Sequence, residues 1–302
     1  MNSSAIDLSR LAAPELVESI DFETLFTKRK AALVALSPAD KRAEVAATLD
    51  LESEPLVMLL QENCYREIVV RQRINDAARA VMLAYARGTD LEHLGALMGV
   101  SRLVVTPADL LTGSAAVMEK DEDLRKRIQI APDGYSVAGP KGAYIATAMS
   151  ANGKVLDAAA MSPVPGEVLI TVLSRDGDGT ADDQLLDIVK AAVNDEDARP
   201  LTDHVTVQSA EIVGYQVEAQ ILTFPGPDPD LVMEEARSRL NEYLGTCHRI
   251  GREVAISGIH AALHVPGCER VELKFPSANV QTNDTQAPYC TAVSLTHAGA
   301  YD

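Results

Sequence analysis

The stretch SEPLVMLLQENCYREIVVRQRINDAARAVMLAYARG, residues 53–88, decides how this chain is organised. Ser53 and Pro55 supply a helix start signal, and no further proline or glycine occurs before Gly88. Apolar residues recur between these ends at steps of three, four or six, which is typical of one face of a helix. At about 1.5 Å per residue, a single helix of this extent would be about 50 Å long. Such a length indicates packing against other long helices.

One apolar stripe runs along the predicted helix. Arg71 interrupts it and lies four residues after Glu67, a spacing that favours an ion pair on the helix surface. Two interpretations stay open: a helical bundle within the chain itself, or a bundle formed between chains. The stripe consists of Leu60, Cys64, Ile68, Ile74, Ala78, Val81 and Tyr85.

The segments on either side are also predicted to be helical. Residues 1–88 form an N-terminal helical region, in which Ser37 and Pro38 mark a break before the long assembly helix. Residues 89–152 form a helical connector. It contains a charged helix over residues 121–130 and, ahead of it, a short helix that opens with a T-x-x-E capping box and is closed by a glycine.

From residue 153 onward the spacing of apolar residues changes from helical to alternating, which predicts strands. Residues 153–211 and residues 212–276 are each predicted to form a small α+β sandwich, with helices on one face of a mostly antiparallel sheet. Residues 277–302 are a polar tail or add one edge strand around residues 292–296. The expected fold class is therefore α+β, with a long-helix region followed by two sandwich domains.

The charge balance makes nucleic acid and anionic membranes poor partners. Lys and Arg number 27 against 44 Asp and Glu, which gives a formal net charge of −17. Proteins that bind phosphate backbones normally carry a basic face. The basic clusters at residues 28–30 and 125–127 are short and lie among acids, as solvated helix surfaces do.

No targeting or membrane segment is predicted. The amino terminus lacks a basic region followed by an apolar one, and no window approaches the roughly 18 apolar residues of a membrane span. Cys64, Cys247, Cys268 and Cys290 include no CxxC pair and fit a reducing cytoplasm. We expect synthesis in the cytosol.

Two clusters could hold a metal ion, and both have simpler interpretations. His260 and His264 are spaced i,i+4 on a predicted helix, but Ala261 stands where a zincin carries its glutamate base. We therefore expect two surface or half-buried histidines. The acidic loop over residues 176–183 ends at a predicted helix start, where acids are favoured. An EF-hand loop there would need glycine at its sixth position, which is Ala181, so an adventitious cation is the weaker alternative.

No catalytic residue and no cofactor are predicted. The sequence contains no G-x-S-x-G elbow, no Walker A motif and no G-x-G-x-x-G motif. A pair of carboxylates for glycoside hydrolysis stays open, because a chain this acidic always offers candidates. Action through surfaces is the better expectation.

Several short segments carry a family resemblance through their joint order and spacing. They are residues 54–87 with Arg73-Ile74-Asn75 at the centre, 90–102, 122–128, 136–144, 165–168, 199–203 and 251–257. Together they resemble the baseplate J-like proteins of contractile-tailed phages, over nearly the whole chain. Many relatives have a longer β-rich insertion where this chain has only residues 103–120, so the resemblance implies a reduced middle domain within the connector.

The resemblance implies a structural wedge subunit of the tail baseplate, located in the virion and without enzymatic activity. Two copies are expected to join one copy of another wedge protein through N-terminal helices, which would place Leu60, Cys64, Ile68, Ile74 and Tyr85 against partner helices. The C-terminal domains would pair with those of neighbouring copies and close a ring around the hub, with sheath and hub proteins as further partners.

The same resemblance implies roles in tail assembly and in the trigger of contraction, since an opening of the ring would release the sheath. Two rival functions remain as alternatives: a tail-associated cell-wall hydrolase, and a metal-binding module. Turnover of peptidoglycan would identify the first, and a gain of stability on adding a metal ion would identify the second.

Overall fold

The structure is a computed structural model that describes residues 8, 11, 21–109, 111–136, 138–195, 199–200, 202–226 and 228–300. Most of the expected helical segment before residue 21 lies outside the described residues, as does the end of the chain after residue 300. The chain divides into two compact units between Leu97 and Met98.

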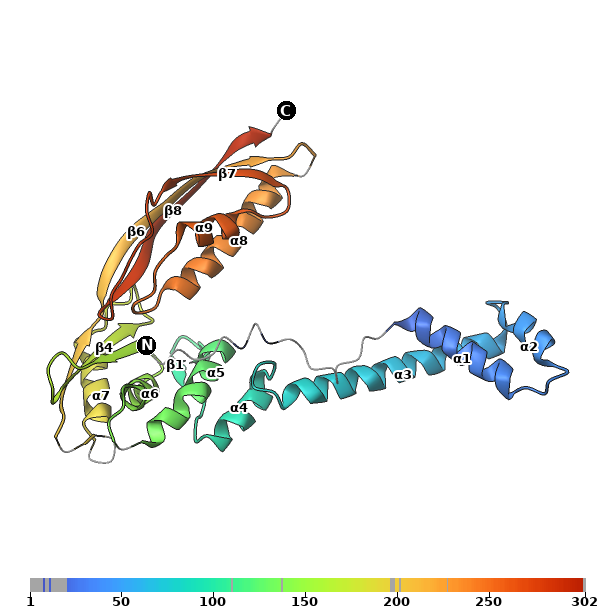
Figure 1. Cartoon of the computed structure of the whole chain (residues 1–302), viewed down its shortest axis with the longest axis horizontal. Coiled ribbons are helices and arrows are strands. Elements are labelled where there is room, and N and C mark those ends of the chain that lie inside the picture. Colours follow the sequence, from blue (N-terminus) through green and yellow to red (C-terminus); the bar gives the residue numbers. More distant parts are fainter. Residues whose placement is uncertain are drawn as a thin grey trace. The chain divides into compact units, whose positions relative to one another are not determined.

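The first unit is helical (Figure 1). It contains α1 (Phe22–Leu36), α2 (Arg42–Leu49), α3 (Pro55–Ala80) and α4 (Gly88–Leu97). The Asp21 carboxylate caps α1 by accepting a hydrogen bond of 2.8 Å from the Thr24 N–H. Pro55 occupies the first turn of α3, where its missing N–H costs no intrahelical bond.

The long helix ends at Ala80, seven residues before the predicted end at Arg87. At about 1.5 Å per residue, its 26 residues extend about 39 Å. Val81 leaves helical geometry, and the following turns bring the N–H of Tyr85 to the Met82 carbonyl at 2.9 Å. The turns bury Ala86 to 1% exposure, so tertiary packing overrides the helical propensity of this breaker-free segment.

The predicted connector, residues 89–152, spans the division: α4 lies in the first unit and the remainder, from Met98, begins the second. β1 (Val104–Thr106) and β2 (Val117–Met118) form a two-stranded antiparallel sheet, the small structure that the reduced middle segment leaves room for. α5 (Asp121–Ile130) is confirmed where the charged helix was predicted, and a 3₁₀ turn (Ala131–Tyr135) follows it. α6 (Lys141–Ala151) completes the connector.

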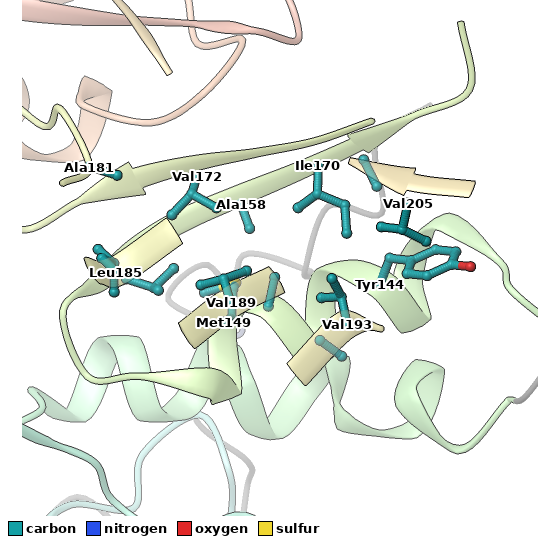
Figure 2. Packing of buried hydrophobic residues seen from close by; sticks show 14 of the residues in the cluster. Tyr144, Met149, Ala158, Ile170, Val172, Ala181, Leu185, Val189, Val193 and Val205 are labelled. Atoms are coloured by element: carbon teal, nitrogen blue, oxygen red, sulfur yellow. The ribbon is translucent and has the colours of Figure 1, made fainter. Parts of the chain in front are cut away.

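The central sheet has the order β3-β4-β5, with β3 (Val155–Met161), β4 (Glu167–Ser174) and β5 (His204–Ser209). α7 (Asp183–Val193) crosses between β4 and β5, which are therefore parallel, whereas β3 and β4 are antiparallel. Figure 2 shows the core that α6 and α7 form with this sheet. Its members include Tyr144, Met149, Ile170, Val172, Leu185, Val189, Val193 and Val205.

The C-terminal sheet has the order β7-β6-β8. Its strands are β6 (Glu211–Thr223), β7 (Cys268–Phe275) and β8 (Gln286–Ala300), and α8 (Pro229–Cys247) and α9 (Ile256–Leu263) cover one face (Figure 1). β8 replaces the polar tail that was one of the two expectations, and at 15 residues it is far longer than the predicted edge strand.

The α+β class with a helical N-terminal region is confirmed, but the sheets are mixed rather than mostly antiparallel. β6 pairs antiparallel with β7 and parallel with β8, just as β4 pairs with one neighbour of each kind. In the central sheet the reason is the crossover, because α7 returns the chain to the starting end of β4 before β5 begins. In the C-terminal sheet, α8 and α9 separate β6 from the antiparallel β7, and β8 then runs parallel to β6. Alternation of apolar residues predicts a strand but does not indicate the direction in which it pairs.

Candidate assembly interface

α3 buries few residues for its length. Its buried residues are Val57, Cys64 and Asn75, three of 26. α8 in the C-terminal domain buries five of 19, which is the pattern of a helix packed on a sheet within one chain. α3 therefore has apolar surface that the described residues of its own unit do not cover.

The uncovered surface consists of large apolar side chains. Ile74 is 60% exposed and Val69 is 65% exposed. We call this set the exposed face of α3: Leu56, Met58, Leu59, Tyr65, Val69, Val70 and Ile74. Large exposed apolar side chains that gather in this way mark protein contacts in soluble proteins.

The exposed face has two flanks. At about 100° per residue, Leu59, Val70 and Ile74 project on one side of the helix, and Met58, Tyr65 and Val69 on another. A charged strip of Glu62, Arg66 and Arg73 lies between the flanks, opposite the buried residues. Each flank is thus a separate apolar ridge.

The remaining side of α3 packs on α1 through an ion-pair cluster. The Arg29 Nε donates to the Glu67 carboxylate at 3.1 Å, and Arg71, four residues on, donates to the same carboxylate at 3.0 Å. Hydrogen bonds from Arg29 and Arg71 hold the pKa of Glu67 below its ordinary value of 4.5. The pair of Glu67 with Arg71 that the spacing predicted is confirmed.

Aromatic rings extend this contact at one end. Phe22 of α1 stacks on Tyr65 with ring centroids 4.7 Å apart, and on Phe26 at 5.5 Å. The Lys30 ammonium lies 4.6 Å from the centroid of the Phe26 ring. α1 and the first half of α3 therefore form one local surface.

The structure divides the five predicted interface residues into three groups. Leu60, Cys64 and Ile68 lie on the side of α3 that carries Glu67, with Cys64 buried at 0% exposure and the other two half-buried. Burial raises the pKa of the Cys64 thiol. Ile74 is exposed, and Tyr85 lies beyond the end of α3, where its hydroxyl donates to the Leu11 carbonyl at 2.6 Å.

Sequence reasoning missed most of the exposed face. It followed a single stripe, whereas α3 is apolar on three sides: the side toward α1 and the two flanks. The missed signal was the pair of adjacent apolar residues at 58–59 and again at 69–70. Adjacent residues lie about 100° apart and cannot share one narrow stripe.

Residues of both candidate metal clusters make local contacts within the chain. Asp182 caps α7 by accepting 2.7 Å from the Leu185 N–H, and Asp176 pairs with Lys154 at 2.9 Å. His264 ends α9, with its Nδ1 4.0 Å from the Cys268 sulfur. Among the residues that the structure describes, no three His, Cys, Asp or Glu side chains converge as metal ligands, and no helix has the length and apolar character to cross a bilayer.

Known proteins match this chain along most of its length. Residues 52–109 match the Baseplate J-like N-terminal domain, residues 136–209 the Baseplate J-like central domain, and residues 215–296 the Baseplate J-like protein C-terminal domain. These matches, on a long exposed helix followed by two small α+β domains, define a protein of the baseplate class, and the chain belongs to the Baseplate J-like family.

Among individual relatives, baseplate protein J of Escherichia phage P2 is 50% identical over 297 residues, which is 98% of each chain. A chain in the six-fold symmetrised cryo-EM structure of the anti-feeding prophage baseplate is 15% identical, with a TM-score of 0.35. That match covers 63% of this chain and 47% of the other. The three domain matches and the relative from phage P2 confirm the family resemblance found in the sequence.

Proposed function

We propose that this chain is a structural wedge subunit of a contractile phage tail baseplate, and that α3 joins it to partner helices. The observation that carries the proposal is the exposed face of α3, seven large apolar side chains on a helix of 26 residues. Burial of apolar surface is the main driving force of association. A unit that leaves this surface in water gains stability when partners cover it.

The two flanks support a complex of more than two chains. One partner helix would cover Leu59, Val70 and Ile74, and a second would cover Met58, Val69 and the part of Tyr65 that Phe22 of α1 leaves exposed. The charged strip between them would stay in solvent. This arrangement suits a trimer in which two copies of the chain join one copy of another wedge protein, each helix contacting two neighbours.

The C-terminal domains would close a ring of subunits around the hub of the baseplate. Membership of the Baseplate J-like family supports a place in the virion tail, with C-terminal domains that contact neighbouring copies around the hub. Opening of that ring would release sheath contraction, which requires interfaces with two packings of similar free energy. A cross-link between C-terminal domains of neighbouring copies should therefore block contraction of assembled tails.

The test of the proposal is co-purification. The tagged chain is expressed together with the tail proteins encoded beside it, and the native mass of the captured complex is measured. Ile74→Glu places a charge on one flank and should abolish the complex, since a buried unpaired charge is strongly unfavourable. A lone monomer of the unaltered chain at high concentration would refute the proposal.

The matched control is Arg73→Glu. Arg73 is the neighbouring residue, it is also exposed, and it lies in the charged strip, so the complex should survive its change. Helix content measured by circular dichroism should be the same in both variants, because both side chains are exposed. Equal loss of the complex in the two variants would point to charge in general and not to the flank.

A further inference from the structure

β8 is an unusual edge strand. It lies at the outside of the C-terminal sheet, paired on one side with β6 and with no strand of the described residues on the other (Figure 1). Its 15 residues, QAPYCTAVSLTHAGA, include no Asp, Glu, Lys or Arg, although such residues make up 24% of the chain. Exposed edges normally carry charges, because unpaired backbone groups otherwise recruit further strands.

The opposite edge of the same sheet has the normal protection. β7 is eight residues long and contains four charged residues, Glu269, Arg270, Glu272 and Lys274. Arg270 pairs with Glu272 at 2.8 Å, and Lys274 pairs with Glu218 at 3.3 Å. One edge of this sheet is thus blocked by charge and the other is left open.

The open edge is regular along one short stretch. The ladder between β6 and β8 shifts register after Cys290 and again after His297, and between these bulges the pairing is continuous over Ala292–His297. Bulges twist an edge away from further pairing, so they leave these six residues as the segment that another strand could join.

We propose that β8 of one copy pairs antiparallel with β8 of a second copy through Ala292–His297. The strand is neutral, so the contact brings together no like charges in a protein of formal net charge −17. A pair related by a two-fold axis is the commonest closed arrangement of identical subunits. The inference rests on the proposed function for the meeting of two copies, and it specifies how their C-terminal domains join.

The side chains are compatible with this pairing. With the two-fold axis perpendicular to the sheet, each face continues into the same face of the second copy. Ala292, Ser294 and Thr296 are exposed on the uncovered face, and their small size lets the strands approach closely. Val293 and Leu295 point to the other face, where they pack with the core of the C-terminal domain.

Cysteine cross-linking tests the register. In the full chain with Cys290→Ser, single cysteines are placed at Ala292, Ser294 and Thr296, and pairs of differently tagged variants are mixed and oxidised. Residues directly opposite in antiparallel strands have Cα atoms about 4.5–5.5 Å apart, within the range that a disulfide bridges. Only pairs whose residue numbers add up to one common total should cross-link.

Ser294→Lys is the second variant. It should weaken self-association, measured by sedimentation, at least about tenfold, because like charges would face one another across the two-fold axis. Glu272→Lys on β7 is the control and should leave self-association unchanged. Cross-links at every position alike, no cross-links at high concentration, or equal effects of the two lysines would each overturn the proposal.

Failure of this inference is distinguishable from failure of the proposed function. If the hetero-complex with neighbouring tail proteins forms and responds to Ile74→Glu, while the β8 cysteines fail to cross-link within it, only the strand pairing is wrong. If β8 pairs cross-link but no hetero-complex forms, the wedge assignment is wrong and the strand contact stands as self-association of this chain.

Discussion

Two buried carboxylates tie the segments of the second unit together. Asp157 of β3, 8% exposed, accepts 2.7 Å from the Lys126 Nζ of α5 and 3.1 Å from the Ile250 N–H, which follows α8. Asp123 of α5 accepts 2.6 Å from Arg175 and 3.3 Å from Arg249. The connector, the central sheet and the C-terminal domain thus meet at two buried carboxylates. Because little water reaches these carboxylates, each of them depends on its hydrogen-bond partners.

Asp157→Asn should destabilise this unit by about 1–3 kcal/mol, because the amide nitrogen cannot accept and leaves one of the two donors without an acceptor. Urea unfolding followed by circular dichroism measures the change. The matched control is Glu235→Gln, which breaks an exposed pair with Arg239 and should change the free energy of unfolding by less than about 0.5 kcal/mol. Equal effects would mean that the Asp157 contacts contribute nothing specific.

The pairing of α1 with α3 should depend on pH at the level of these two helices. Arg29 and Arg71 hold the pKa of Glu67 below its ordinary value of 4.5. A group with a lowered pKa stabilises the folded form above its unfolded pKa and loses that contribution as the pH falls through the folded value. The α1–α3 contact should therefore be intact near neutral pH and weaken in acid.

Hydrogen exchange of the α1 amides measures this contact. Glu67→Gln should speed exchange relative to the unaltered chain near neutral pH, and the two proteins should become alike once Glu67 is protonated. Glu62→Gln is the control, since Glu62 pairs with Arg66 on the surface of the same helix and not with α1 among the described residues. A difference between Glu67→Gln and the unaltered chain that persisted unchanged into strong acid would contradict the role of this carboxylate.

Element by element, local signals predicted the regular parts well. α5 begins at its acidic first turn at Asp121, and α7 buries Leu185, Val189 and Val193 at steps of four. The predicted end of α3 was wrong, because no proline or glycine marks the end of the helix at Ala80. The length of β8 was missed because an edge strand with one uncovered face has weak apolar alternation, and its polar residues resemble a tail.

At the scale of the whole molecule, the two units should differ in how much they need a partner. The second unit has cores built on both sheets, whereas residues 21–80 of the first bury only Leu49, Val57, Cys64 and Asn75. A fragment of residues 98–302 should therefore fold alone, and the full chain should unfold in two transitions, the first from the helical unit.

Circular dichroism and limited proteolysis measure this order, with cleavage expected within residues 21–97 before any cleavage of the two α+β domains. Addition of the partner wedge protein should raise the midpoint of the first transition and leave the second nearly unchanged. A single transition for the full chain, or an unfolded 98–302 fragment, would show that the units depend on each other for stability.

The sequence by itself determined the properties that depend on neighbours along the chain. Periodicity placed most helices and strands, and short segments in a fixed order pointed to the Baseplate J-like family, which the three domain matches confirm. Each of these signals lies within a few turns of helix or a few residues of strand. They need no knowledge of what packs against them.

Only the tertiary structure decided which surfaces remain uncovered. α3 is apolar on three sides, and the sequence does not show which of them packs on α1. The hydrogen bond from Arg29 to Glu67 shows that it is the side that carries Glu67. β8 became an open edge only once β6 lay between it and β7. Exposure depends on contacts between residues far apart in sequence, so a chain that assembles through uncovered surfaces reveals them only when it is folded.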